Sequence, residues 1–186
     1  MPRVRIADLD ADVVERSPQE SLTVGSPEMR ALVERAIQVK LDVVGADFRE
    51  TAAGAGHPGR EALNYGHTLA HAIERAERYT YRHGAAVSIG MVFVAELARL
   101  AGRLDDATAE RHRTVLDSLG LPTSYTGAGW PELLATMRID KKSRGDLMRF
   151  VVLDGLARPA VLEGPPEELL EEAFRAVSGG FFRSAR

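Results

Sequence analysis

A cluster of histidines gives this sequence its clearest capacity for chemistry. His67 and His71 lie four residues apart, and His83 follows after a short connector. On a helix, side chains four residues apart project from the same face. Neutral imidazole is a strong ligand for zinc-like divalent cations. The spacing therefore indicates a metal or anion site, with hydrogen-bonded core histidines as the plainer alternative.

The histidine pattern also limits which metal chemistry is open. A catalytic zinc site usually takes three protein ligands and keeps one position for water or substrate. The histidine pair would need an oxygen ligand, and no nearby acid is obvious from the sequence. Zincin proteases require Glu directly after the first histidine, whereas Thr68 stands there, which disfavours a metalloprotease. His57, in a glycine-rich loop, and His112, among charges that we expect to be exposed, receive no role.

Lys40 falls on the apolar stripe of a predicted helix, three residues after Ile37. In one interpretation its aliphatic stem covers apolar surface while the ammonium reaches water. In the other, the ammonium points into a cleft and binds an anion.

Further cations and amides are candidates for the same pocket. Arg60 lies one helical turn before Asn64, and the run Asp140-Lys141-Lys142 occupies a polar loop before a predicted hairpin. Taken singly, each is more simply a solvated charge. Together with His71 they could bind carboxylate and phosphate, because Arg offers a planar fork and Lys a point charge.

The elements that must position these residues are mostly helical. Ser26-Pro27-Glu28 predicts a helix start, with a capping serine, proline at the first position and an acid in the first turn. Helical spacing of apolar residues predicts further helices over 60–78, 83–103, 106–119, 130–137 and from Pro166 onward. Segments 147–153 and 160–162 flank Asp154-Gly155 and predict a small β-hairpin.

We therefore expect a mainly α, bundle-like domain with a minor β element. Its predicted parts are an N-terminal arm over 1–25, a helical metal- and substrate-binding domain over 26–178, and a frayed tail over 179–186. The sequence has no strand–glycine-loop–helix unit, so no nucleotide fold is visible.

Composition narrows the class of protein. With 186 residues, 45% of them hydrophobic, the chain can hold one well-buried domain. A formal charge of −3 argues against nucleic acid as a partner, and the lack of cysteine excludes disulfides and fits a reducing cytoplasm. Segment 85–101 is apolar but contains Glu96 and Arg99, so we expect a core helix and no membrane partner; no signal peptide is seen.

At this point the sequence resembles a known family, the 3-dehydroquinate synthases. The matching residues are Leu63–Glu74 (LNYGHTLAHAIE), His83-Gly84, Gly90-Met91, Val39-Lys40 with Val43-Val44, Arg60 and Asp140-Lys141-Lys142, spread over roughly residues 28–177. The resemblance implies the C-terminal domain of the dehydroquinate synthase/glycerol dehydrogenase type. The family's N-terminal NAD-binding domain, which carries a glutamate metal ligand, is expected to lie upstream of this chain.

The resemblance implies a cytoplasmic enzyme of the shikimate pathway, which leads to chorismate and the aromatic amino acids. Its members are carbon–oxygen lyases acting on phosphate. They convert the seven-carbon phosphorylated keto acid DAHP into 3-dehydroquinate and phosphate. A bound NAD+ transiently oxidises a hydroxyl, and a divalent metal, Zn2+ or Co2+, polarises the reacting oxygens. Family members are commonly homodimers.

The same resemblance assigns roles to individual residues. It implies that His67 and His83 are metal ligands. The implied catalytic and substrate-binding set is His71 and Asn64 at the phosphate end, Lys40 and Arg60 at the carboxylate and hydroxyls, and one of Lys141 and Lys142 as a further phosphate contact. Glu50 matches an acidic residue beside the substrate only loosely, because the following loop, 51–59, is longer than is usual in the family.

Two other functions stay open. One is a related sugar-phosphate cyclase or a metal-dependent polyol dehydrogenase built on the same helical domain. The other is a noncatalytic, truncated helical module that acts by binding or dimerisation. Alone, the chain is expected to bind metal weakly and to lack turnover.

Overall fold

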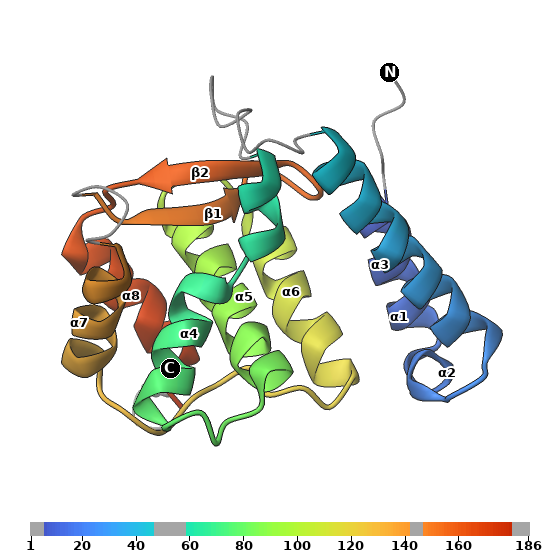
Figure 1. Ribbon diagram of the computed structural model, residues 1–186, viewed down its shortest axis with the longest axis horizontal. Helices are drawn as coiled ribbons and strands as arrows, with labels where there is room; N and C mark the ends of the chain where they lie inside the picture. The colour runs from blue at the N-terminus through green and yellow to red at the C-terminus, as the bar shows by residue number, and fades with distance from the viewer. Residues whose placement is uncertain (1–5, 47–58, 142–146, 180–186) are drawn as a thin grey trace.

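The computed structural model describes residues 6–46, 59–141 and 147–179. The chain is mainly helical with one two-stranded hairpin, which confirms the predicted fold class (Figure 1). Its elements are α1 (Ile6–Arg16), α2 (Pro18–Leu22), α3 (Pro27–Ala46), the 3-10 helix η1 (Gly59–Asn64), α4 (His67–Ala76), α5 (His83–Leu100), α6 (Asp106–Ser118), α7 (Trp130–Lys141), β1 (Arg149–Leu153), β2 (Pro159–Glu163) and α8 (Glu167–Val177).

Helix α5 is the centre of the folded body, which we define as the described residues from Gly59 to Gly179. It packs against α4, α6, α8 and β1. Phe93 of α5 is fully buried and contacts the rings of Trp130 and Phe150. By length and composition α5 alone among the described helices could cross a membrane, yet 56% of that stretch is buried within the structure. It is the core helix of the body.

A tight crossing fixes the start of α4 against α5. Gly66 has a φ of +79°, in the left-handed region, which an L side chain rarely adopts. A Cβ on Gly90 would lie 2.0 Å from the carbonyl oxygen of Gly66, so both positions need glycine. The continuous helix predicted over 60–78 is therefore wrong. Since the backbone turns at Gly66, η1 ends at Asn64 and α4 begins at His67.

The hairpin closes one side of the body and holds η1. Strands β1 and β2 pair antiparallel, with Val151 opposite Val161. Arg103, just beyond α5, binds Asp154 in the hairpin turn at 2.5 Å. Arg149 of β1 binds both Glu163 across the hairpin and Glu61 of η1. The segment that leads into the histidine motif is therefore anchored to the sheet.

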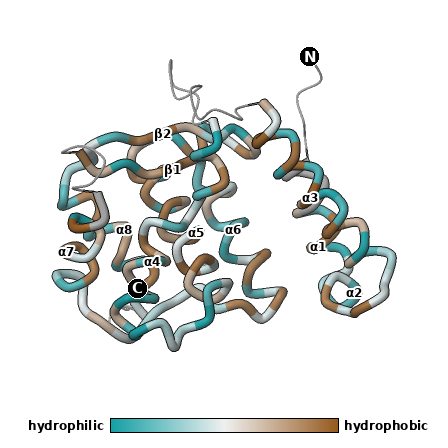
Figure 2. Tube along the Cα trace, in the orientation of Figure 1, coloured by the Kyte–Doolittle hydropathy of each residue, from teal (hydrophilic) through white to brown (hydrophobic). Residues whose placement is uncertain are grey.

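Helices α1, α2 and α3 form what we call the N-terminal unit, which lies to one side of the body (Figure 1). Ser26 caps α3 as predicted, with its Oγ accepting from Met29 N at 3.0 Å. The unit reaches the body through α1 against α6 and α3 against η1. Helix α3 buries no residue along its length, although hydrophobic residues recur along it (Figure 2). The predicted boundary between residues 25 and 26 stays a prediction, because α3 packs with α1 and α2 on one side and with η1 on the other.

Candidate metal and substrate site

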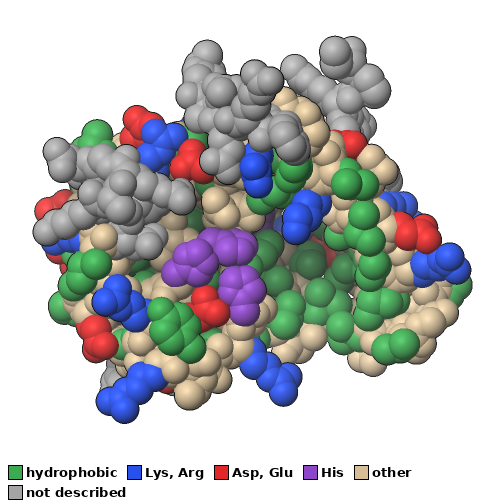
Figure 3. Space-filling view, in the orientation of Figure 1, with side chains coloured by type: hydrophobic (Ala, Val, Ile, Leu, Met, Phe, Trp, Pro, Cys, Tyr) green, Lys and Arg blue, Asp and Glu red, His purple; other side chains and the backbone are tan. Residues whose placement is uncertain are grey.

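Three imidazoles converge where α4 and α5 begin. The ring centre of His67 lies 5.3 Å from that of His83 and 5.6 Å from that of His71, while His71 and His83 are 6.4 Å apart. Two imidazoles sharing a tetrahedral ion through bonds of about 2.1 Å have ring centres roughly 5 Å apart. On the surface, the histidines form one patch beside a hollow lined by hydrophobic side chains (Figure 3). The spacing of His67 and His83 suits a shared cation.

The backbone holds the His67 ring in one tautomer. Its Nδ1 lies 3.0 Å from the carbonyl oxygen of Tyr65. Because a carbonyl only accepts, Nδ1 carries the proton and Nε2 keeps its lone pair. Partial burial lowers the pKa of His67, with smaller contributions from His71 and His83. A neutral ring with Nε2 available is the form in which histidine binds metal.

Glu74 holds His83 in a corresponding way. Its Oε1 lies 3.1 Å from His83 Nδ1, and the Glu74 side chain is only 15% exposed. A carboxylate bound to the second nitrogen of a ligating histidine is a common support in metal sites. Glu74 thus supports His83 through the nitrogen away from the proposed cation, a contact that was not predicted from the sequence. The sequence did carry the signal, because Glu74 follows His71 by three residues and shares its helix face.

The donor types fit a divalent metal, but the described residues do not complete its ligand set. Within residues 6–46, 59–141 and 147–179, no group of three or more His, Asp or Glu side chains is arranged to hold an ion. His67 and His83 supply two nitrogen donors. A further ligand would have to come from outside the described residues.

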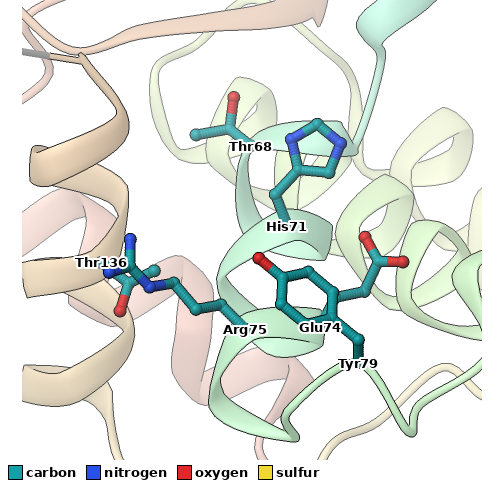
Figure 4. A pocket seen from close by; sticks show the side chains of 6 residues that line it. All are labelled: Thr68, His71, Glu74, Arg75, Tyr79 and Thr136. Atoms are coloured by element: carbon teal, nitrogen blue, oxygen red, sulfur yellow. The ribbon is translucent and has the colours of Figure 1, made fainter. Parts of the chain in front are cut away.

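His71 has different surroundings from the other two histidines. Its ring makes no hydrogen bond with a described residue, unlike those of His67 and His83. It borders a shallow cavity of about 300 Å³ between α4 and α7 (Figure 4); the lining residues are Thr68, His71, Glu74, Arg75, Tyr79 and Thr136. In this view the Arg75 side chain extends toward Thr136 of α7, whereas Glu74 projects from the other side of α4. Five of these six side chains can donate hydrogen bonds to an anion, whereas the sixth, Glu74, is a carboxylate that binds His83.

The remaining predicted residues are spread over neighbouring elements. Arg60 and Asn64 lie on η1, directly before the histidine motif, and Lys40 is exposed on α3, the helix that packs against η1. Lys141 is the last residue of α7, and its side chain lies outside the described part of the chain, as do Lys142 and Glu50. The structure thus brings the three histidines together in space. Arg60 and Asn64 lie on η1, which directly precedes α4 in the sequence.

Sequence reasoning also missed the environment of His112. The residue is half-buried on α6, and its Nε2 lies 3.1 Å from the hydroxyl of Tyr65. The expected exposure of His112 is wrong, because α6 packs this face against the rest of the body. Nothing in the local sequence identifies a partner 47 residues away.

Solved structures identify the fold class. The chain superposes on 2-epi-5-epi-valiolone synthase from Streptomyces hygroscopicus, solved with NAD+ and Zn2+ bound, with a TM-score of 0.76 and 20% identity over 94% of this chain and 48% of that one. A 2-deoxy-scyllo-inosose synthase, solved with carbaglucose-6-phosphate, NAD+ and Co2+, gives a TM-score of 0.67 and 22% identity over 94% of this chain and 53% of that one. The fold is the one found in about half of each of these synthases.

Sequence comparison identifies the family within that fold. A family model described as 3-dehydroquinate synthase C-terminal matches residues 6–143. The chain is 59% identical over 166 residues to the 3-dehydroquinate synthase of Streptomyces avermitilis and 58% identical over 167 residues to that of Nocardia farcinica. These matches cover 89% and 90% of the chain but only 44% and 43% of the relatives. The chain belongs to the 3-dehydroquinate synthase C-terminal family.

Proposed function

We propose that this chain is the metal- and substrate-binding part of a 3-dehydroquinate synthase, which converts DAHP into 3-dehydroquinate and phosphate. The observation that carries the proposal is the pair His67 and His83, 5.3 Å apart, each with its Nδ1 held by an oxygen acceptor. The high identity to curated synthases supports it. Because the chain spans less than half the length of those relatives, turnover is proposed for the protein that includes the remainder, acting in the cytoplasm as a homodimer.

In this proposal His67 and His83 hold a divalent cation through Nε2, and a carboxylate from the remainder of the enzyme completes the ligand set. When bound, the cation supplies Lewis acidity at the reacting oxygens, and NAD+, held mainly by that remainder, supplies reversible hydride transfer. The Tyr65 carbonyl and Glu74 orient the two rings through their Nδ1 atoms. This orientation leaves Nε2 of each ring for the cation.

The other residues would bind the two anionic ends of the substrate. Arg60 is suited to the carboxylate, since a guanidinium can bind both of its oxygens, and Lys40 adds a point charge from α3. His71 and Asn64 would bind the phosphate, with Lys141 or Lys142 as a further cation. The cavity beside His71 extends this phosphate end toward α7, where the lysine pair follows.

A reconstitution experiment tests the activity. The chain is mixed with a separately produced NAD-binding part of the Streptomyces avermitilis relative, NAD+, Zn2+ and DAHP, and phosphate release is measured. We expect release only when both parts are present. If the intact relative is active while the mixture releases no phosphate at any ratio of parts, the catalytic proposal is wrong.

The same mixture separates the alternatives. The first alternative is a sugar-phosphate cyclase of another pathway. Such an enzyme would turn over a phosphorylated hexose in preference to DAHP. Phosphate release from DAHP and none from the hexose supports the synthase. A noncatalytic module would give neither product while still associating with the added part.

Three alanine variants test the division of roles among the histidines. His67→Ala and His83→Ala should each lose metal from the reconstituted protein, because each removes one of the ligands. His71→Ala should keep metal content within about twofold and raise the KM for DAHP about tenfold or more, as expected when a hydrogen bond to a charged group is lost. Metal analysis after gel filtration and steady-state kinetics give the two readouts. Equal metal loss in all three variants contradicts these roles.

A further inference from the structure

A partly buried hydrogen-bonded pair lies behind the histidine motif. The Tyr65 hydroxyl is 3.1 Å from His112 Nε2, and His112 Nδ1 is 2.8 Å from the carbonyl oxygen of Thr108. Since that carbonyl only accepts, His112 Nδ1 donates to it and Nε2 is left as the acceptor for Tyr65. Burial lowers the pKa of His112 and raises that of Tyr65, so both groups stay neutral near pH 7. The direction of each hydrogen bond is thereby defined.

Tyr65 is held at both of its ends. Its hydroxyl binds α6 through His112, and its carbonyl oxygen accepts from His67 Nδ1 at 3.0 Å. Gly66 lies between Tyr65 and His67. A Cβ added to Gly66 would clash with the backbone of Met91 and Gly90 of α5. A continuous path of contacts therefore leads from α6 to the ring of His67, with little backbone freedom along it.

We infer that His112 is a positioning residue for His67, acting through Tyr65. By anchoring the Tyr65 ring, His112 fixes the carbonyl that sets the tautomer and direction of the His67 imidazole. The metal-binding part of this inference rests on the proposed function, whereas the effect on the tautomer does not. Outer hydrogen-bond partners of metal ligands commonly change metal affinity about 10- to 100-fold. His112 acts one residue further out, so we expect about 3- to 10-fold.

Helix α6 also connects the Tyr65–His112 contact to the N-terminal unit. Arg111, the residue before His112, binds Asp12 and Glu15 of α1. Adjacent residues of one helix thus contact the N-terminal unit and the histidine motif. A displacement of α6 would therefore change the contacts that orient His67 as well as those with α1.

The first test reads the tautomer directly, in the chain without metal. Long-range ¹H–¹⁵N spectra distinguish protonated from unprotonated imidazole nitrogens. We expect His67 to be protonated at Nδ1. Tyr65→Phe keeps the ring but removes the hydroxyl, and should shift His67 toward a mixture of tautomers. Tyr125→Phe is the matched control, because it removes another hydroxyl that binds a side chain, Glu77, and a backbone N–H.

The second test follows Zn2+ titrations on the same imidazole signals. Tyr65→Phe and His112→Leu should each weaken Zn2+ binding about 3- to 10-fold relative to the unchanged chain. His112→Gln, whose amide oxygen can accept from Tyr65 in place of Nε2, should restore affinity to within about twofold. Tyr125→Phe should leave it unchanged even where it lowers the melting temperature more. If Tyr65→Phe fails to fold, the comparison of His112→Leu with His112→Gln still provides the test.

The outcomes separate this inference from the proposed function. If His67→Ala abolishes Zn2+ binding while the Tyr65 and His112 variants leave both tautomer and affinity unchanged, the positioning role is wrong and the metal site stands. An effect of Tyr125→Phe as large as that of Tyr65→Phe also overturns positioning, because general loosening then explains it. If His67→Ala keeps full Zn2+ affinity, the metal site itself fails, and the tautomer measurement alone decides whether His112 positions His67.

Discussion

The body and the N-terminal unit differ in how far their hydrophobic side chains are buried. In the body, α5 buries ten of its residues, and its core side chains come from α4 through α8 and the hairpin. In the N-terminal unit, α3 buries none over 20 residues, and Val33, Ile37 and Leu41 on one of its faces are 48%, 55% and 61% exposed. Stability rises with apolar area removed from water. The body is therefore self-supporting, whereas the N-terminal unit depends on a few contacts.

This difference divides the candidate site. The histidines lie on helices α4 and α5 of the body, and their oxygen partners, the Tyr65 carbonyl and Glu74, come from the same part. Lys40 lies on α3, whose placement depends on the contact with η1 and on α1. In the proposed site, the histidines and Arg60 of η1 should therefore be preorganised, while the position of Lys40 depends on how firmly the N-terminal unit is held.

The largest contrast is expected from truncating one apolar side chain in each region. Phe93→Ala removes a fully buried ring from the body and should cost about 3–5 kcal/mol of unfolding free energy. Ile37→Ala removes a side chain that is 55% exposed and should change it by less than about 0.5 kcal/mol. Urea unfolding followed by the fluorescence of Trp130, the single tryptophan, measures both. A comparable cost for Ile37→Ala would mean that α3 is buried in solution.

The next effect concerns two glycines of the same helix. Gly90→Ala places a Cβ against the backbone of Gly66 and should cost about 1–3 kcal/mol, because neither backbone can move away easily. Gly84→Ala, where the added atom meets nothing within 4 Å, should be neutral or slightly stabilising. Thermal unfolding compares the two variants. Equal melting temperatures would contradict the tight crossing of α4 and α5.

Local signals made much of the fold predictable. Ser26-Pro27 identified the start of α3, and Asp154-Gly155 the hairpin, because caps and turns act within a few residues. The mainly helical class followed from the spacing of apolar residues. The break at Gly66 was missed because its left-handed backbone follows from the packing of Gly90, 24 residues later. Such a contact is visible only in three dimensions.

The candidate site shows the same limit. The helical spacing of His67 and His71 predicted a shared face, and the ring distances agree with it. Glu74 could have been found by the same rule. His112 could not, since its link to Tyr65 depends on how α6 packs. The roles of Lys40, Arg60 and Asn64 stay predictions, because they concern contacts with a substrate, which neither local spacing nor packing defines.

The smallest effect concerns the attachment of the N-terminal unit to the body. Arg111 donates to Glu15 at 2.7 Å, and this hydrogen bond is the main reason that the pKa of Glu15 lies below its usual value. A lowered carboxyl pKa contributes stability above the ordinary range for glutamate, and that stability is lost as the pH falls through the lower, folded value. Acidification should therefore loosen α1 from α6 before the body unfolds.

Hydrogen exchange of the α1 amides, corrected for the intrinsic effect of pH, measures this loosening. Because both partners are partly exposed, Arg111→Ala should raise α1 exchange at neutral pH only about two- to fivefold, and should remove the added dependence on acid. Trp130 fluorescence should stay that of the folded body under the same conditions. Arg175→Ala, which removes an exposed ion pair with Glu171 inside α8, controls for the loss of a surface charge. If α1 exchange and Trp130 fluorescence change together as the pH falls, the N-terminal unit and the body unfold as one, and the division between them is not energetic.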